Sequence, residues 1–172
     1  MPMWWWLVFV AIVSVGFVAF TGAPYVPSKR RDLRVAFTEL YPLSSADVLV
    51  DIGSGDGVVL RAARAYGAQA VGYEIHPILV AIARFLSRRD PGVRVYLANF
   101  WKAAMPQDTT VVYTFGDARD IMKMYKKVQT EATRLSRSLQ FITYGFDVPG
   151  IAPAKAAGAH YLYTVVPLQE GR

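Results

Sequence analysis

Hydrophobic and polar positions follow two periods along most of this chain. Short apolar runs predict strands near residues 47–53, 68–75, 93–100, 109–116, 138–146 and 160–168. Between them, apolar residues spaced three and four apart predict helices near residues 29–41, 56–67, 76–90 and 117–136. Strands that alternate with helices predict an α/β fold, with a mostly parallel sheet covered by helices on both faces.

The N-terminal stretch follows neither period. Residues 1–28 carry no charged side chain, and the 21 residues from 3 to 23, almost all of them apolar, would span roughly 30 Å as a helix, about one bilayer core. Three tryptophans stand at one end and "SKRR" at the other. We therefore predict a single transmembrane helix over residues 1–23, with the N-terminus outside and the rest of the chain cytoplasmic.

Two other interpretations of this stretch fit less well. A cleaved signal peptide would carry its positive charge before the apolar run, whereas here the charge follows it. A buried core helix would not be expected to carry three consecutive tryptophans and no polar face. After the anchor, residues 24–45 are predicted to form a linker and a pre-domain helix, and residues 46–172 one α/β domain, with no room for a further domain.

Composition narrows the chemistry. The chain has no cysteine, which excludes disulfides and thiolate nucleophiles, and its two histidines lie far apart, so no metal site is expected. The formal net charge is +6. A positive net charge favours binding to nucleic acid or to an anionic membrane surface. Because of the apolar N-terminus we favour the membrane and expect no nucleic-acid partner.

The stretch "DIGSGDG", residues 51–57, follows the first predicted strand of the domain. Its three glycines let the backbone turn tightly and let a ligand approach it closely. The spacing D-x-G-x-G-x-G is not the dinucleotide pattern, because Val58 occupies the position of its last glycine, and no P-loop lysine follows. Asp51 and Asp56 would repel a pyrophosphate but would suit a ligand that carries an ammonium and a sulfonium.

Two further strand ends complete the candidate site. Glu74 ends the second strand and can accept both hydroxyls of a ribose. In "ANFW", Asn99 can hydrogen-bond an adenine edge, while Phe100 or Trp101 can cover the adenine ring. The predicted cofactor-binding residues are Asp51, Gly53, Ser54, Gly55, Asp56, Gly57, Glu74, Ile75, Asn99 and Phe100.

The glycine loop and the acidic end of the second strand resemble class I S-adenosylmethionine-dependent methyltransferases. With "PYVPS", "AVGYEIHPILVAIAR" and "NFWK", the chain is similar to a smaller group, the membrane-anchored protein lysine methyltransferases. Animal members of that group are mitochondrial and modify the ATP synthase c-subunit and the adenine nucleotide translocase. They carry asparagine–proline where this chain has His76–Pro77, and aspartate–leucine where it has Asn99–Phe100.

The resemblance implies a Rossmann-like methyltransferase domain with S-adenosylmethionine as its cofactor. Without an evident mitochondrial presequence, we expect a prokaryotic relative in the plasma membrane. The favoured acceptor is a lysine of a membrane or membrane-adjacent protein, with membrane lipid as a further partner. The alternatives are phospholipid headgroup N-methylation and a non-catalytic module that binds the cofactor and a partner. The candidates for orienting the acceptor are Tyr25 and Tyr113.

Overall fold

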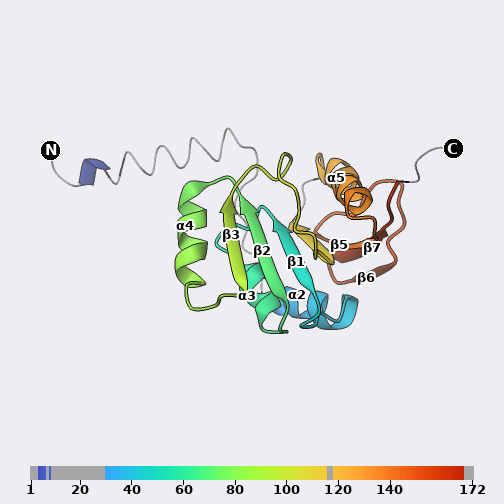
Figure 1. Ribbon diagram of the computed structural model, residues 1–172, viewed down its shortest axis with the longest axis horizontal. Coiled ribbons are helices and arrows are strands. Elements are labelled where there is room, and N and C mark those ends of the chain that lie inside the picture. Colours follow the sequence, from blue (N-terminus) through green and yellow to red (C-terminus); the bar gives the residue numbers. More distant parts are fainter. Residues whose placement is uncertain (1–3, 7, 9–29, 116–117, 169–172) are drawn as a thin grey trace.

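A seven-stranded sheet forms the centre of the computed structural model, which describes residues 4–6, 8, 30–115 and 118–168 (Figure 1). Its strands stand in the order β3-β2-β1-β4-β5-β7-β6. The first five strands pair in parallel, and β7 pairs antiparallel with both β5 and β6, so the predicted mostly parallel sheet is confirmed. Their bounds are β1 Val48–Ile52, β2 Gln69–Glu74, β3 Val93–Leu97, β4 Val111–Phe115, β5 Leu139–Tyr144, β6 Lys155–Ala157 and β7 His160–Val165.

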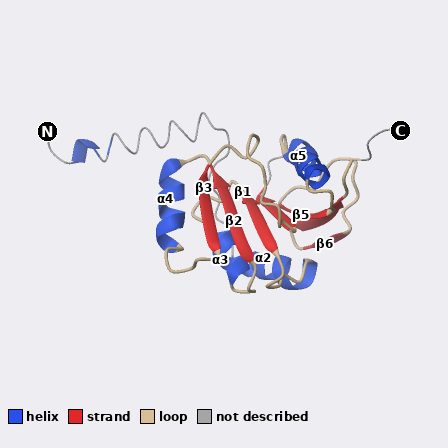
Figure 2. Cartoon of the chain, viewed as in Figure 1, coloured by secondary structure: helices blue, strands red, loops and turns tan. Residues whose placement is uncertain are grey.

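Helices cover both faces of this sheet, as the alternating pattern predicts (Figure 2). One buried cluster joins one face of the sheet to α2, η1, α3 and α4 through residues such as Phe37, Leu60 and Val80. A second cluster joins the other face to α5 through Ile121 and Val128. The helices are α2 Arg30–Val35, η1 Ala36–Leu40, α3 Val58–Arg64, α4 Pro77–Leu86 and α5 Ile121–Arg134.

Most of the predicted helices and strands are present, but they are shorter than the residue ranges predicted from the sequence. Pro77 stands in the first turn of α4, where its fixed φ suits a helix and its missing N–H costs nothing. The predicted helix at 29–41 is α-helical only to Val35 and continues as the π-helical turn η1. The short strand β6 has no sequence signal, because lysine and alanine are poor strand formers and its pairing with β7 is a tertiary contact.

The predicted membrane anchor, residues 1–23, lies outside the described residues except for residues 4–6 and 8. Tyr25 and the rest of the predicted linker also lie outside them. Among the residues that the structure describes, no helix is both long enough and apolar enough to cross a membrane.

The helix before β1 is part of the main core. Leu33, Phe37 and Leu40 are each at most 2 % exposed and belong to the cluster that includes α3 and the sheet. The Phe37 ring lies 6.0 Å from the ring centroids of both Tyr66 and Tyr113, in edge-on geometry. Packing of this apolar face therefore fixes α2 and η1 against the sheet beside the glycine loop.

We predict that Phe37→Ala lowers the free energy of unfolding by about 3–5 kcal/mol, the usual cost of emptying a buried phenylalanine site. Phe85→Ala is the matched control, because the Phe85 ring is 63 % exposed and should cost far less. Denaturant unfolding of the full chain in detergent measures both. Equal losses for the two variants would show that the helix before β1 does not contribute to the core.

Candidate functional site

The glycine loop occupies the point where the strand order of the sheet reverses. From β1 the chain runs outward to β2 and β3, then returns to place β4 on the other side of β1. In open α/β sheets a ligand binds at this position, beyond the carboxyl ends of the strands. The loop between Ile52, the end of β1, and Val58, the start of α3, lies at this crevice.

The three glycines of the loop are required by backbone geometry. Gly53, Gly55 and Gly57 have φ values of +70°, +53° and +80°, which other residue types rarely adopt. Gly53 is also exposed, and no described atom lies within 4 Å of the position that a Cβ would take there. A ligand can therefore approach the backbone directly at Gly53.

The carboxylate of Glu74 ties this loop to the end of β2. Its Oε2 accepts the N–H of Gly55 at 2.9 Å, and its Oε1 accepts the N–H groups of Ile75 and His76, each at 2.8 Å. The side chain is only 8 % exposed. An ionised carboxylate offers about four acceptor positions, so three backbone bonds leave capacity for a ligand hydroxyl. Glu74 thus both shapes the loop and presents an acceptor at the predicted ribose position.

Gly72, two residues earlier on β2, allows the loop to lie this close to the strand. A Cβ at Gly72 would come within 2.5 Å of Ser54 Oγ and 2.7 Å of Ser54 Cβ and Leu60 Cδ1. Real side chains do not tolerate such distances, so any larger residue would push the loop away. Sequence reasoning missed Gly72, because its closest neighbours come from a different part of the chain.

The two loop aspartates have different surroundings. Asp51 is 3 % exposed, and its burial, together with the negative charges of Glu74 and Asp56, raises its pKa well above the usual range. A cationic ligand group beside Asp51 would favour the charged carboxylate and offset that burial. Asp56 already has a cation of the protein beside it, Arg61 at 3.3 Å. Asp51 is therefore the stronger candidate for meeting a ligand ammonium.

The remaining predicted residues lie at the ends of β2 and β3. Ile75 follows Glu74 and is 42 % exposed, so its apolar side chain is available at this edge. Asn99 Oδ1 accepts the N–H of Trp101 at 3.0 Å, which closes the turn after β3. Phe100 is only 5 % exposed and packs against Tyr73, whereas Trp101 is 37 % exposed. Of the two aromatic residues proposed to cover an adenine, Trp101 is the more accessible.

A second group of side chains lies at the ends of β4 and β5, on the opposite side of β1. The rings of Phe115 and Tyr144 are 5.2 Å apart, and Phe115 is 38 % exposed. The Tyr144 hydroxyl donates a 2.7 Å hydrogen bond to Asp32 on α2. The sequence points to "TFGD", residues 114–117, as a place where this fold receives its substrate, but Tyr144 was missed, although ligands bind at the carboxyl ends of strands and β5 ends there.

Tyr113, a predicted acceptor-orienting residue, is fully buried in the middle of β4. Its hydroxyl lies 3.1 Å from Nε2 of His160, which is itself 1 % exposed. Burial lowers the pKa of His160 to about 4, so the ring is neutral at pH 7. The pair is a polar contact within the core, and a role of Tyr113 toward an acceptor stays a prediction.

Comparison with known proteins agrees with this geometry. The sequence matches the family model described as the ANTKMT methyltransferase domain over residues 51–155, from the glycine loop to β6. The ATP synthase c-subunit lysine N-methyltransferase of Xenopus laevis is 37 % identical over 134 residues, covering 76 % of this chain and 56 % of that protein. The adenine nucleotide translocase lysine N-methyltransferase of Mus musculus is 28 % identical, covering 78 % and 58 %.

A solved structure extends the likeness to nearly the whole described fold. An RNA methyltransferase from Salinibacter ruber, determined with S-adenosyl-L-homocysteine, superposes with a TM-score of 0.70 at 27 % identity. The match covers 85 % of this chain and 98 % of that one. By contrast, the chain spans little more than half the length of the lysine methyltransferases that it matches.

The sequence resemblance is thereby confirmed at the level of the family. The match covers the glycine loop, Glu74 and the strand ends that carry the candidate site. S-adenosylmethionine is the cofactor that goes with this class. The chain belongs to the ANTKMT methyltransferase domain family, within the class I S-adenosylmethionine-dependent methyltransferases.

Proposed function

We propose that this protein transfers a methyl group from S-adenosylmethionine to the amine of a lysine in a membrane or membrane-adjacent protein. The observation that carries the proposal is the loop around Gly53, open to a ligand and held by Glu74. The identity of the acceptor draws support from the relatives, which are named for lysines of the ATP synthase c-subunit and of the adenine nucleotide translocase.

The residues of the crevice fit this cofactor. Gly53 gives the backbone space that a ligand needs, and Glu74 has acceptor capacity left for a ribose hydroxyl. Asp51 supplies a buried carboxylate for the amino group of the methionine part. When bound, S-adenosylmethionine supplies an electrophilic methyl group on a sulfonium.

We place the acceptor at the ends of β4 and β5. There Phe115 and Tyr144 form an aromatic wall, and the hydrogen bond to Asp32 fixes the Tyr144 ring. A lysine has a pKa of about 10.4 in water and must lose its proton before it can accept a methyl group. Apolar rings displace water and so favour the neutral amine, and alignment of that amine supplies much of the remaining catalysis.

The proposal also includes the location of the protein at a membrane. With residues 1–23 as a membrane anchor and the catalytic domain on the cytoplasmic side, enzyme and target would share one plane, which raises their effective concentration. A lipid headgroup amine would benefit equally, so phospholipid N-methylation is the enzymatic alternative. A module that binds the cofactor without catalysis is the alternative of another class.

The cofactor site is tested by Glu74→Gln. We expect this variant to bind S-adenosylhomocysteine about 10- to 100-fold more weakly, because it removes a charged acceptor from ribose hydroxyls. Isothermal titration calorimetry on the full chain in detergent measures the change. Asp108→Asn is the control, because it also replaces a carboxylate by an amide. Asp108 is exposed and precedes β4, at the amino ends of the parallel strands and so opposite the glycine loop, and this variant should bind S-adenosylhomocysteine as the wild type does. Equal affinity for the wild type and Glu74→Gln would contradict the assigned site.

The acceptor is tested by methyl labelling. Purified protein and S-adenosylmethionine with a labelled methyl group are incubated with membranes of the source cell, which are then separated into protein, lipid and RNA fractions. We expect label on lysine in the protein fraction, lost with Glu74→Gln. Label in lipid or in RNA would refute the lysine assignment. Tight binding of S-adenosylhomocysteine with no label in any fraction would favour the non-catalytic module.

A further inference from the structure

Helix α4 exposes its apolar stripe on the outside of the molecule. Ile78, Ile82 and Phe85 follow one another at helical spacing and are 42 %, 41 % and 63 % exposed, with Leu86 beside them at 47 %. Only Val80 and Ala83 of this helix are buried residues that belong to the core. We call the exposed set, together with Arg88 and Arg89, the α4 face.

Exposed apolar side chains concentrate in this part of the chain. Of the twelve large hydrophobic residues exposed between residues 30 and 168, five lie between Ile75 and Leu86, on or next to α4. Single exposed hydrophobics need no explanation, but a cluster of this kind marks an interaction surface. The cluster includes Leu97, which is 55 % exposed at the end of the edge strand β3, next to which α4 packs.

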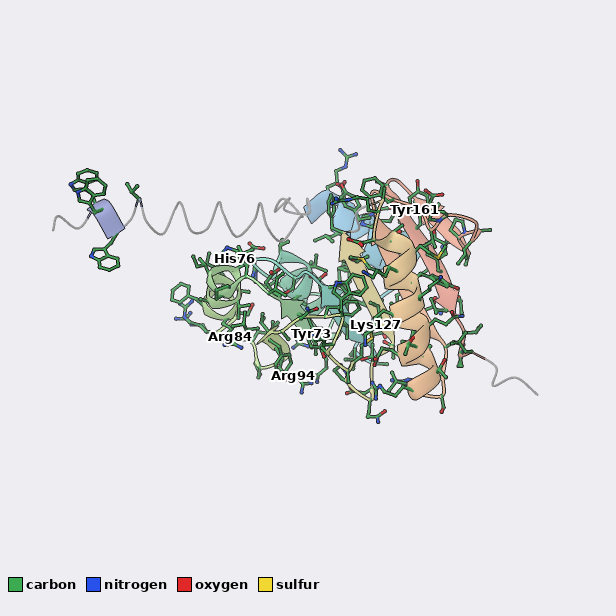
Figure 3. All side chains as sticks on the ribbon, turned by 90° about the horizontal axis from the view of Figure 1, so that it is seen from above. Tyr73, His76, Arg84, Arg94, Lys127 and Tyr161 are labelled. Carbon is green, nitrogen blue, oxygen red and sulfur yellow. The ribbon has the colours of Figure 1, made fainter. Side chains whose placement is uncertain are left out.

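Most charged side chains in this stretch are positive. Residues 75–105 contain five basic side chains and one acidic side chain outside the site, Asp90. Asp90 is paired with Arg64 of α3 at 2.9 Å, so it does not neutralise the α4 face. Arg84 of α4 lies on the other side of the domain from Lys127 of α5 (Figure 3). An apolar stripe bordered by arginines matches helices that lie in the interface of an anionic membrane.

A second copy of the chain fits this surface less well. Two α4 faces packed together would bring the arginines of both copies close, with no carboxylate in the face to compensate them. The cores of protein interfaces are usually depleted in charge. In a bilayer, the same arginines meet phosphate groups while the apolar side chains enter the region below the headgroups.

We infer that the α4 face lies on the surface of a membrane that contains anionic lipid. The inference deepens the proposed function and rests on it for the presence of an anchor. If residues 3–23 span the bilayer, the six residues 24–29 allow the domain to stand no more than about 20 Å from the surface. Because α4 begins at Pro77, three residues after Glu74, this contact brings the carboxyl end of β2, which carries the cofactor site, toward the membrane.

The absence of cysteine makes a direct test possible. The full chain carrying Ile82→Cys is labelled with an environment-sensitive fluorophore and reconstituted into vesicles of phosphatidylcholine and phosphatidylglycerol that contain nitroxide-labelled lipid. Thr130→Cys is the matched control, since Thr130 is exposed on α5, which packs on the other face of the sheet. We expect blue-shifted, quenched emission from the label on α4, and neither change from the label on α5.

A charge variant tests the role of the arginines. Arg88→Glu combined with Arg89→Glu should reduce quenching of the α4 label, while affinity for S-adenosylhomocysteine stays unchanged. Equal quenching of both labels, or none of the α4 label, would overturn the inference. So would a shielded α4 label that forms disulfides between chains, which would indicate a self-association surface. If the α4 label is quenched but the protein transfers no methyl group in the labelling experiment, the membrane contact of the α4 face stands and only the proposed enzymatic activity is refuted.

Discussion

Three backbone hydrogen bonds to one carboxylate hold the candidate site together. Glu74 accepts them from Gly55 in the glycine loop and from Ile75 and His76 after β2, which fixes two segments 19 residues apart in sequence. Hydrogen bonds to a charged group are among the strongest in proteins. The open space beside Gly53 and the start of α4 both depend on this contact.

Sheet order then separates the functions in space. The ends of β2 and β3 lie on one side of β1, where Glu74 and Trp101 suit a nucleoside. The ends of β4 and β5 lie on the other side, where Phe115 and Tyr144 suit an acceptor. In the proposed reaction the methyl group would pass from one side to the other across the end of β1, the position that the glycine loop occupies.

Local patterns in the sequence predict most of this arrangement. Strand and helix periods give the parallel sheet, and the rule for carboxyl ends brings the loop and Glu74 to one edge. Such patterns do not predict long-range contacts. The hydrogen bond between Tyr144 and Asp32 joins residues 112 positions apart, and Gly72 must be a glycine because a Cβ there would clash with Ser54. The period of α4 predicts an amphipathic helix, but only the structure shows that its apolar stripe faces outward.

We expect cofactor binding to require that the glycine loop lies against β2, where Glu74 holds it. The most direct measurement is the affinity for S-adenosylhomocysteine of Gly72→Ala alone and combined with Ser54→Gly. The alanine methyl should displace the loop and weaken binding by about tenfold or more, while removal of the Ser54 side chain, which makes two of the three closest contacts, should restore part of the loss. Wild-type affinity in Gly72→Ala, or no recovery in a folded double variant, would contradict this account.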